Sequence, residues 1–220
     1  MEVADNYNTW LFERSRPYLG RSVLDVGAGV GTFTALAAPG RDRVVTAEPD
    51  SEFADLLEQR FSAMPNVQVL QSEAEDVTLG EPVDSIICFN VLEHIPDDQA
   101  AVGRFRELLN PGGRLLLVVP AHPLLLGATD RALGHERRYR KGPLAGLLAG
   151  AGFEVEDIRH VNPVGALGWF VSSRLLRSEQ IPAGPLRFYD RLVPLLRALD
   201  RLHPPFGLSL WAVARKPPHS

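Results

Sequence analysis

The feature that constrains this chain most is a glycine-rich turn that follows an apolar run near the N-terminus. Residues 23–26 are typical of a buried strand, and glycine then occupies every second position, at Gly27, Gly29 and Gly31. Glycine permits positive φ angles and lets a ligand approach the backbone closely. The first N–H groups of the helix that follows would point into the site. A strand, a glycine turn and a helix form the first half of a βαβ nucleotide-binding unit, so we expect an α/β fold.

The spacing of the glycines separates two classes of nucleotide site. A dinucleotide fingerprint is G-x-G-x-x-G, whereas this chain has D-x-G-x-G-x-G from Asp25 to Gly31. This pattern resembles motif I of the class I S-adenosylmethionine-dependent methyltransferases. The resemblance implies that S-adenosylmethionine is the cofactor. It also implies that the methionyl part is held by Asp25, Gly27, Ala28, Gly29 and Gly31.

Polar side chains also follow the next three predicted strands, which span residues 44–48, 67–71 and 83–89. Ligands in doubly wound sheets bind beyond the carboxyl ends of the strands, so these positions would share one site with the glycine turn. Glu48 stands 17 residues after Gly31, near the spacing of about 20 at which an acidic residue binds ribose hydroxyls. The resemblance implies that the cofactor-binding residues at these strand ends are Glu48, Pro49, Glu73, Ala74, Asn90 and Val91.

The alternation of strands and helices predicts a doubly wound parallel sheet of the α/β class. The resemblance implies a Rossmann-like, seven-stranded mixed sheet whose last strand, at residues 208–215, runs antiparallel. Asn-Pro-Gly-Gly at 110–113 predicts a turn before the fifth strand. We interpret residues 1–220 as a single methyltransferase domain. Within it, residues 121–141 form an acceptor-side loop and residues 160–206 a helical, lid-like insert.

The N-terminal segment is predicted to cover one edge of the cofactor site. Residues 7–18 contain several aromatic side chains and are expected to form a short helix. In related methyltransferases an N-terminal aromatic often closes over the cofactor, so the resemblance makes Tyr7 a cofactor-binding residue. The alternative is that these aromatic side chains only form a packed flap.

The acceptor-side loop follows the fifth strand, at the ligand-binding end of the sheet, and carries the predicted catalytic residues His135 and Tyr139. A histidine of near-neutral pKa suits proton removal from a hydroxyl or amine. Tyrosine can orient an acceptor by a hydrogen bond, and arginine can fork onto a carboxylate or phosphate. The predicted substrate-binding residues are His94, His122, Arg137, Arg138 and Trp169. The alternative is structural: both arginines pair with helix-end carbonyls and acids, and His135 buttresses the loop.

Charge is distributed unevenly along the chain. The formal net charge is −4, which does not suggest a nucleic-acid-binding surface. Residues 159–216 nevertheless hold nine Lys or Arg and only three Asp or Glu. Four arginines of a predicted helix at 186–202 share one face. This basic face is expected to be an ordinary solvated face over a core stripe. The alternative is that the insert is a lid that also contacts an anionic acceptor or a membrane surface peripherally.

The single cysteine, Cys88, lies in the apolar run 85–89 and is predicted to be a core thiol. One cysteine excludes an internal disulfide and a cysteine-based zinc site, and we predict no metal site. Absence of disulfides fits a reducing cytoplasm. No apolar run approaches the roughly 20 residues that span a bilayer, and the N-terminus lacks the features of a signal peptide.

These features together predict an enzyme that transfers a methyl group from S-adenosylmethionine to a small-molecule or lipid-linked acceptor. The sulfonium methyl is already activated, so the protein mainly has to align the nucleophile with it. Two alternatives remain: a non-catalytic, cofactor-binding partner subunit, and a nicotinamide-dependent oxidoreductase, against which the glycine spacing argues. The sequence leaves open whether oxygen, nitrogen or carbon is methylated, and the oligomeric state.

Overall fold

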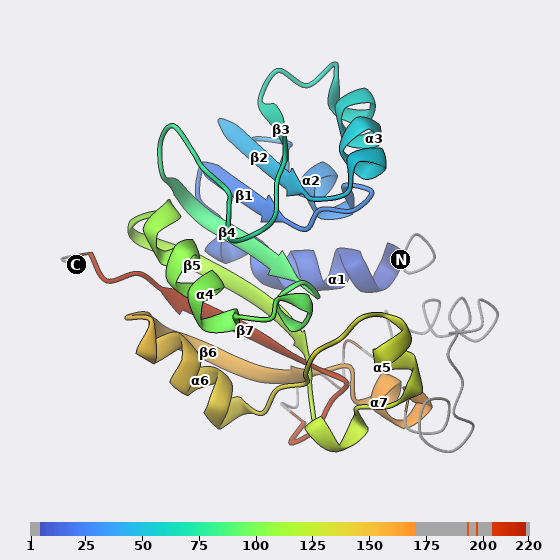
Figure 1. The fold of residues 1–220 in the computed structure, drawn as a ribbon. Coiled ribbons are helices and arrows are strands. Elements are labelled where there is room, and N and C mark those ends of the chain that lie inside the picture. The colour runs from blue at the N-terminus through green and yellow to red at the C-terminus, as the bar shows by residue number, and fades with distance from the viewer. Residues whose placement is uncertain (1–4, 170–192, 194–196, 198–203, 219–220) are drawn as a thin grey trace.

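A computed structural model describes residues 5–169, 193, 197 and 204–218 of the chain (Figure 1). Its strands are β1 (Ser22–Val26), β2 (Arg43–Glu48), β3 (Val67–Gln71), β4 (Val83–Phe89), β5 (Leu109–Pro120), β6 (Glu154–Val161) and β7 (Ser209–Arg215). They form one sheet in the order β3-β2-β1-β4-β5-β7-β6. Only β7 runs antiparallel, to both β5 and β6, among the described strands. The predicted doubly wound, seven-stranded mixed sheet is confirmed.

Helices cover both faces of the sheet (Figure 1). The α-helices are α1 (Asp5–Ser15), α2 (Thr32–Ala37), α3 (Ser51–Phe61), α4 (Asp98–Leu108), α5 (Ala128–Ala132), α6 (Lys141–Gly150) and α7 (Pro163–Trp169). Three short 3-10 helices are η1 (Arg16–Tyr18), η2 (Leu92–His94) and η3 (Pro123–Leu125). Side chains of α4 and α6 pack in one core layer, and side chains of α1 and α2 pack in the other.

The central strand β4 shows why its sequence is almost wholly apolar. Ile86 and Cys88 point into the layer beneath α4 and α6, whereas Ile87 and Phe89 point into the layer beneath α1 and α2. Successive side chains of a strand alternate between faces, so a strand covered on both sides must be apolar at every position. Cys88 is fully buried, which confirms the predicted core thiol.

Side-chain caps begin two of the helices. The Asp50 carboxylate accepts hydrogen bonds from the backbone N–H groups of Glu52 and Phe53 at the start of α3. The Asp97 carboxylate accepts one from Ala100 at the start of α4. Each cap satisfies an N–H group that the helix leaves unpaired and stabilises the fold by about 1 kcal/mol.

Two local predictions were wrong. The Asn-Pro-Gly-Gly segment is a bulge inside β5 rather than a turn before it, because Leu109 already pairs with Val83 and the next pair is Ser85 with Arg114. Gly112, with φ of +80°, supplies the unusual backbone angle that this irregularity needs. The predicted acceptor-side loop is not all loop either, because η3 and α5 fold within it. We therefore refer to residues 121–141 as the acceptor-side segment.

The insert before β7 begins with α7, directly after β6. The predicted basic helix at 186–202 lies outside the described residues except for Val193, which is buried, and Arg197. Within the described part of the chain, no helix combines the length and the hydropathy that crossing a bilayer requires.

Candidate cofactor and acceptor site

The three glycines of the turn after β1 all have positive φ angles, of 64°, 53° and 80°. Two of them are packed against other elements. A Cβ atom at Gly27 would lie 2.5 Å from Cγ2 of Val91, and one at Gly31 would lie 2.6 Å from Cδ2 of Leu57. A Cβ atom at Gly29 would meet no described atom within 4 Å. The outer glycines therefore allow close packing, and the middle one exposes backbone to open space that a ligand can enter.

Glu48, at the end of β2, holds the glycine turn in place. Its carboxylate accepts hydrogen bonds from the Gly29 N–H at 2.7 Å and from the Asp50 N–H at 3.2 Å. The N–H groups of Gly27 and Ala28 donate to the Ala47 carbonyl. The ends of β1 and β2 thus meet, and a buried carboxylate stands at the position predicted to bind ribose.

Asp25 lies beneath the turn and is 2% exposed. Its carboxylate accepts a hydrogen bond of 2.6 Å from the Thr34 hydroxyl, which joins β1 to α2. Burial raises the pKa of Asp25 to about 7, because the charged form loses water that one hydroxyl only partly replaces. Asp25 therefore ties β1 to the helix that follows the glycine turn.

Two further predicted cofactor residues, Asn90 and Val91, lie at the same edge of the sheet. Asn90 follows β4 with a positive φ of 55°, and its N–H donates to the Val118 carbonyl at 2.7 Å. Val91, next to it, faces Gly27, so the ends of β1 and β4 also meet. The others are spread wider: Pro49 and Glu73 are exposed, Ala74 is buried, and Tyr7 packs its ring 5.6 Å from that of Trp10 in α1.

The acceptor-side segment returns to the sheet beside the end of β5. The Tyr139 N–H donates to the Pro120 carbonyl, and the His122 N–H donates to the Tyr139 carbonyl. The Glu136 N–H donates to the Glu93 carbonyl in η2 at 2.9 Å. These bonds bring residues near 135 next to the turn that follows β4, where the predicted cofactor-binding residues Asn90 and Val91 lie.

A buried ion pair organises this segment. The Arg138 guanidinium lies 2.7 Å from the Asp130 carboxylate, and both side chains are at most 1% exposed. Asp130 also accepts hydrogen bonds from the Gly127 N–H and from Nδ1 of His135. Burial by itself would raise the pKa of Asp130, but the hydrogen bonds from His135 and Arg138 hold it below its usual value. Asp130 is therefore a carboxylate, and sequence reasoning did not single it out.

Arg137 and Tyr139 are bound to neighbouring protein groups. Arg137 donates to the carbonyls of Ile95 and Pro96 at 2.6 and 2.7 Å. The Tyr139 hydroxyl donates to the Asp98 carboxylate at 2.9 Å, and burial raises the pKa of Tyr139. This geometry favours the structural alternative for these two residues and for Arg138.

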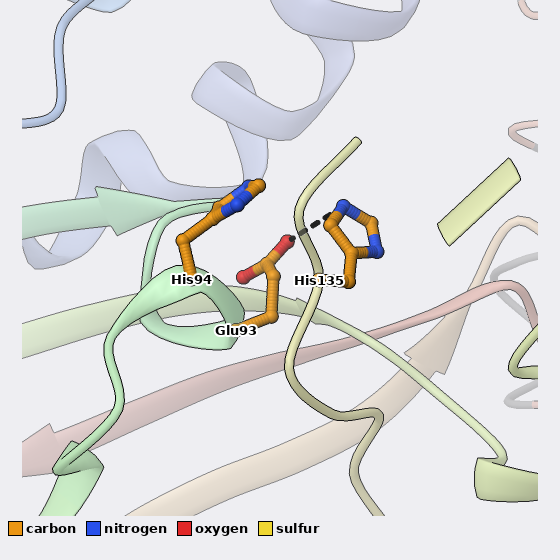
Figure 2. A group of neighbouring side chains, drawn as sticks. All are labelled: Glu93, His94 and His135. Carbon is orange, nitrogen blue, oxygen red and sulfur yellow. Dashed lines mark ion pairs between the residues drawn. The ribbon is translucent and has the colours of Figure 1, made fainter. Parts of the chain in front are cut away.

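Three side chains form a cluster where the acceptor-side segment meets η2 (Figure 2). Glu93 and His94 belong to η2. His135 faces them from the irregular part of the acceptor-side segment, between α5 and α6. Nε2 of His135 lies 4.0 Å from Oε1 of Glu93, and the rings of His94 and His135 are 4.9 Å apart. Burial and the nearby His135 lower the pKa of His94, and burial raises the pKa of Glu93 to about 8.

Glu93 was missed as a site residue. A Glu-His pair in the turn shortly after a buried strand was visible in the sequence, but only the fold shows that the carboxylate is fully buried. Two other predicted substrate residues, His122 and Trp169, lie outside this cluster. The His122 ring stacks on His160 at 4.9 Å, and Trp169 in α7 lies under the Arg138 guanidinium, 4.8 Å from ring centre to Cζ.

Comparison with known proteins identifies the family of this fold. Residues 3–158 match the family model described as "Methyltransferase domain". The chain belongs to this family, as a class I S-adenosylmethionine-dependent methyltransferase domain. The resemblance that the glycine spacing suggested is confirmed, and with it the assignment of S-adenosylmethionine as the cofactor.

Two curated relatives and one solved structure illustrate the similarity. A "Probable S-adenosylmethionine-dependent methyltransferase" of Mycolicibacterium smegmatis is 31% identical over 63% of this chain and 54% of its own length. Trans-aconitate 2-methyltransferase of an Azoarcus species is 28% identical over 81% of this chain and 58% of its own length. The N-methyltransferase NodS of Bradyrhizobium japonicum, in complex with S-adenosyl-L-homocysteine, superposes with a TM-score of 0.63. Its sequence is 16% identical, and the match covers 96% of this chain and 86% of NodS. The methyltransferase domain thus spans little more than half the length of these two curated relatives.

Proposed function

We propose that this methyltransferase domain transfers the methyl group of S-adenosylmethionine to a small-molecule acceptor. The observation that carries the proposal is the glycine turn, in which Gly29 faces open space while Glu48 fixes its N–H group. The names of the relatives support a small acceptor, since one of them is a trans-aconitate methyltransferase.

The protein residues at this edge would bind and orient the cofactor. The backbone of the glycine turn would approach the methionyl part closely, Glu48 would accept hydrogen bonds from the ribose hydroxyls, and Asn90 would lie beside the transferring methyl group. The bound cofactor supplies an activated methyl group. Alignment of an acceptor with it can contribute on the order of 7–11 kcal/mol to lowering the barrier in favourable cases.

His135 is the residue that we propose to act on the acceptor, as a base or as an orienting group. Its Nδ1 faces the Asp130 carboxylate at 2.9 Å, so that nitrogen carries the proton and donates it. Nε2 then presents a lone pair toward the interior of the cluster. We assign supporting roles to Arg137, Arg138 and Tyr139, because their polar atoms already bond to protein.

Two measurements test the function together. Calorimetry with S-adenosylmethionine and with a nicotinamide dinucleotide identifies the cofactor, and tighter binding of the dinucleotide would revive the oxidoreductase alternative. Incubation with methyl-labelled S-adenosylmethionine and a low-molecular-mass cell extract then measures label transfer to small molecules. Cofactor binding without transfer to any fraction would support the partner-subunit alternative. Once an acceptor is known, His135→Ala should lower kcat and leave cofactor affinity unchanged.

A lipid-linked acceptor and peripheral membrane contact remain hypotheses from the sequence. They rest on the excess of basic residues between 159 and 216, where five of the nine Lys or Arg lie outside the described part of the chain. A flotation assay with anionic liposomes at low and high salt tests them. Absence of salt-sensitive binding would leave the insert only its proposed role as a lid over a water-soluble acceptor in the cytoplasm.

A further inference from the structure

The Glu93 side chain is an anomaly in an otherwise well-satisfied core. It is 0% exposed, and neither carboxylate oxygen has a hydrogen-bond partner among the described residues. Burying an unpaired carboxylate costs several kcal/mol, so such groups are normally paired or coordinate a metal. A proton on Glu93 would remove the charge but would still leave both oxygens without partners.

The groups that face Glu93 make the anomaly sharper. Asp130 accepts a hydrogen bond from Nδ1 of His135, so a neutral His135 ring would present the lone pair of Nε2 to Glu93, 4.0 Å from one of its oxygens. In His94, Nδ1 lies 3.2 Å from the Gly134 carbonyl, which can only accept, so Nε2 of that ring also keeps a lone pair. Lone pairs that converge without a proton between them call for a cation.

The spacing of these groups suits a metal ion. One donor atom from each of Glu93, His94 and His135 lies within 4.8 Å of the other two. Zinc is about 2.0–2.2 Å from nitrogen and oxygen ligands, so ligands around one ion are about 3–3.5 Å apart. The three side chains would need to draw together by about an ångström. His94 is exposed, which gives an ion a route into the cluster.

The surroundings of both histidines resemble those of metal-bound imidazoles. A ligating histidine generally donates its other N–H to a carboxylate or a carbonyl, which fixes the ring and its tautomer. His135 has Asp130 in that place, and His94 has the Gly134 carbonyl. Arg138 donates a hydrogen bond of 2.8 Å from Nε to Asp130. The ring of His135 is therefore oriented by Asp130, which is itself held by Arg138.

We propose that Glu93, His94 and His135 bind a divalent transition-metal ion, of the class that includes Zn²⁺, Co²⁺ and Mn²⁺. Two imidazoles and one carboxylate favour such ions over Mg²⁺ and Ca²⁺, which prefer oxygen ligands. The prediction from sequence that the chain has no metal site rested on its cysteine count, and this proposal replaces it. Three protein ligands leave coordination positions open, as in catalytic zinc sites.

The open positions indicate a role for the ion, which rests on the proposed function. An acceptor with a hydroxyl or enol oxygen could bind the ion directly, and the ion would favour its deprotonated form. His135 would then orient the acceptor through the ion and would not itself remove a proton. The inferred acceptor class is therefore an oxygen nucleophile that can bind a metal.

The test starts from chelator-treated protein, titrated with Zn²⁺ in a calorimeter and with Co²⁺ followed by visible absorption. The wild type should bind one equivalent, and the Co²⁺ spectrum should report nitrogen and oxygen ligands. Glu93→Gln and His135→Ala should each weaken binding by at least tenfold. His94→Ala does the same at an exposed position, so it keeps the test valid if a buried variant fails to fold.

Matched controls separate the cluster from the rest of the surface. Glu136→Gln makes the same charge change at an exposed neighbour, and His160→Ala removes an imidazole outside the cluster. Both should bind the ion like the wild type.

The proposal would be overturned if the wild type failed to bind one equivalent of the ion. It would also be overturned if folded Glu93→Gln and His94→Ala bound the ion as tightly as the wild type. S-Adenosylmethionine affinity, measured on the same samples, tests the proposed function separately, because the glycine turn does not contact the cluster residues in any described interaction.

Discussion

Asp25 and Asp130 are both buried aspartates, one in β1 just before the glycine turn and one within the acceptor-side segment, and they differ in what surrounds them. Asp25 accepts a hydrogen bond from a neutral hydroxyl, that of Thr34. Asp130 accepts from the Arg138 guanidinium, a histidine ring and a backbone N–H. Burial therefore raises the pKa of Asp25 to about 7, whereas the hydrogen-bond donors around Asp130 outweigh burial and lower its pKa.

The difference suits the two halves of the proposed site, the cofactor side at the glycine turn and the acceptor side at the acceptor-side segment. The cofactor side consists mainly of backbone shape, with glycines whose missing side chains define the space. The acceptor side consists of charged side chains fixed by one another across long sequence separations. Backbone shape suits a cofactor shared by a whole family, and side-chain clusters can differ between members that act on different acceptors.

Removal of the Asp130 carboxylate should have the largest effect on stability. Asp130→Ala leaves the buried Arg138 guanidinium without its anion, and breaking a buried pair in this way costs about 3–5 kcal/mol. Urea denaturation measures the free energy of unfolding. Asp42→Ala is the control, because Asp42 pairs with Arg21 on an exposed surface, where a pair contributes about 1 kcal/mol or less. Equal losses for the two variants would contradict this picture of the acceptor side.

A side chain at Gly29 should abolish cofactor binding with little change in the fold. Gly29→Val fills the open space at the turn, and we expect at least a 100-fold loss of S-adenosylmethionine affinity, about 2.7 kcal/mol. Calorimetry measures the affinity, and circular dichroism checks the fold. Gly40→Val imposes a similar backbone strain, since Gly40 has φ of +75° and open space around it, but lies outside the site. Unchanged affinity in Gly29→Val would refute the assignment of the turn.

The pKa values of the two aspartates are shifted in opposite directions, so their contributions to stability depend on pH in opposite ways. The dependence due to Asp25 is the one that can be tested near neutral pH. The pKa of Asp25 is raised in the folded state from 3.8 to about 7, so the folded state holds this proton more tightly than the unfolded state. Its contribution to stability is therefore full below pH 4 and is lost as the pH rises toward 7. Asp25→Asn should remove a slope of up to about 1.4 kcal/mol per pH unit.

Urea midpoints between pH 5 and pH 8 measure that slope. Asp42→Asn makes the same chemical change at an exposed carboxylate and should leave the slope as in the wild type. A wild-type stability that rises with pH over this whole window, with no change in Asp25→Asn, would show that Asp25 is ionised in the fold.

The smallest effect is expected for Tyr139→Phe. The substitution removes a hydroxyl that donates to Asp98 and leaves the ring in place, so unfolding should become easier by about 1 kcal/mol. The rate of methyl transfer should not change, because the hydroxyl faces Asp98. A tenfold loss of kcat at an unchanged melting temperature would instead restore the catalytic role that the sequence suggested for Tyr139.

The sequence was informative wherever a local pattern determines local structure. The glycine spacing, the apolar run of β4 and the caps Asp50 and Asp97 act within a few residues, so the turn, the strand and two helix starts could be predicted. The bulge in β5 could not, because it depends on how residue 84 and its neighbours in β4 pair with a segment far along the chain.

For the acceptor-side segment, the sequence predicted where it lies but not how its side chains interact. Residue type suggested that His135 and the arginines do chemistry, but it does not tell which polar atoms already have partners. Arg138 finds Asp130 eight residues away, and Glu93 meets His135 across 42 residues, contacts that follow from the packing of the whole segment on η2. Hence Glu93 and Asp130, which the structure makes central, were absent from the predicted site.

The position of β7 in the sheet has a consequence for synthesis. This strand is the last of the seven to leave the ribosome, yet it lies between β5 and β6 and pairs with both. Until it is made, β6 has no neighbour in the sheet and β5 has an open edge. An unpaired strand edge is prone to association with other chains. The nascent protein must therefore keep the open edge of β5 and the unpaired β6 protected, by chaperones or by its own helices, until residues 209–215 emerge.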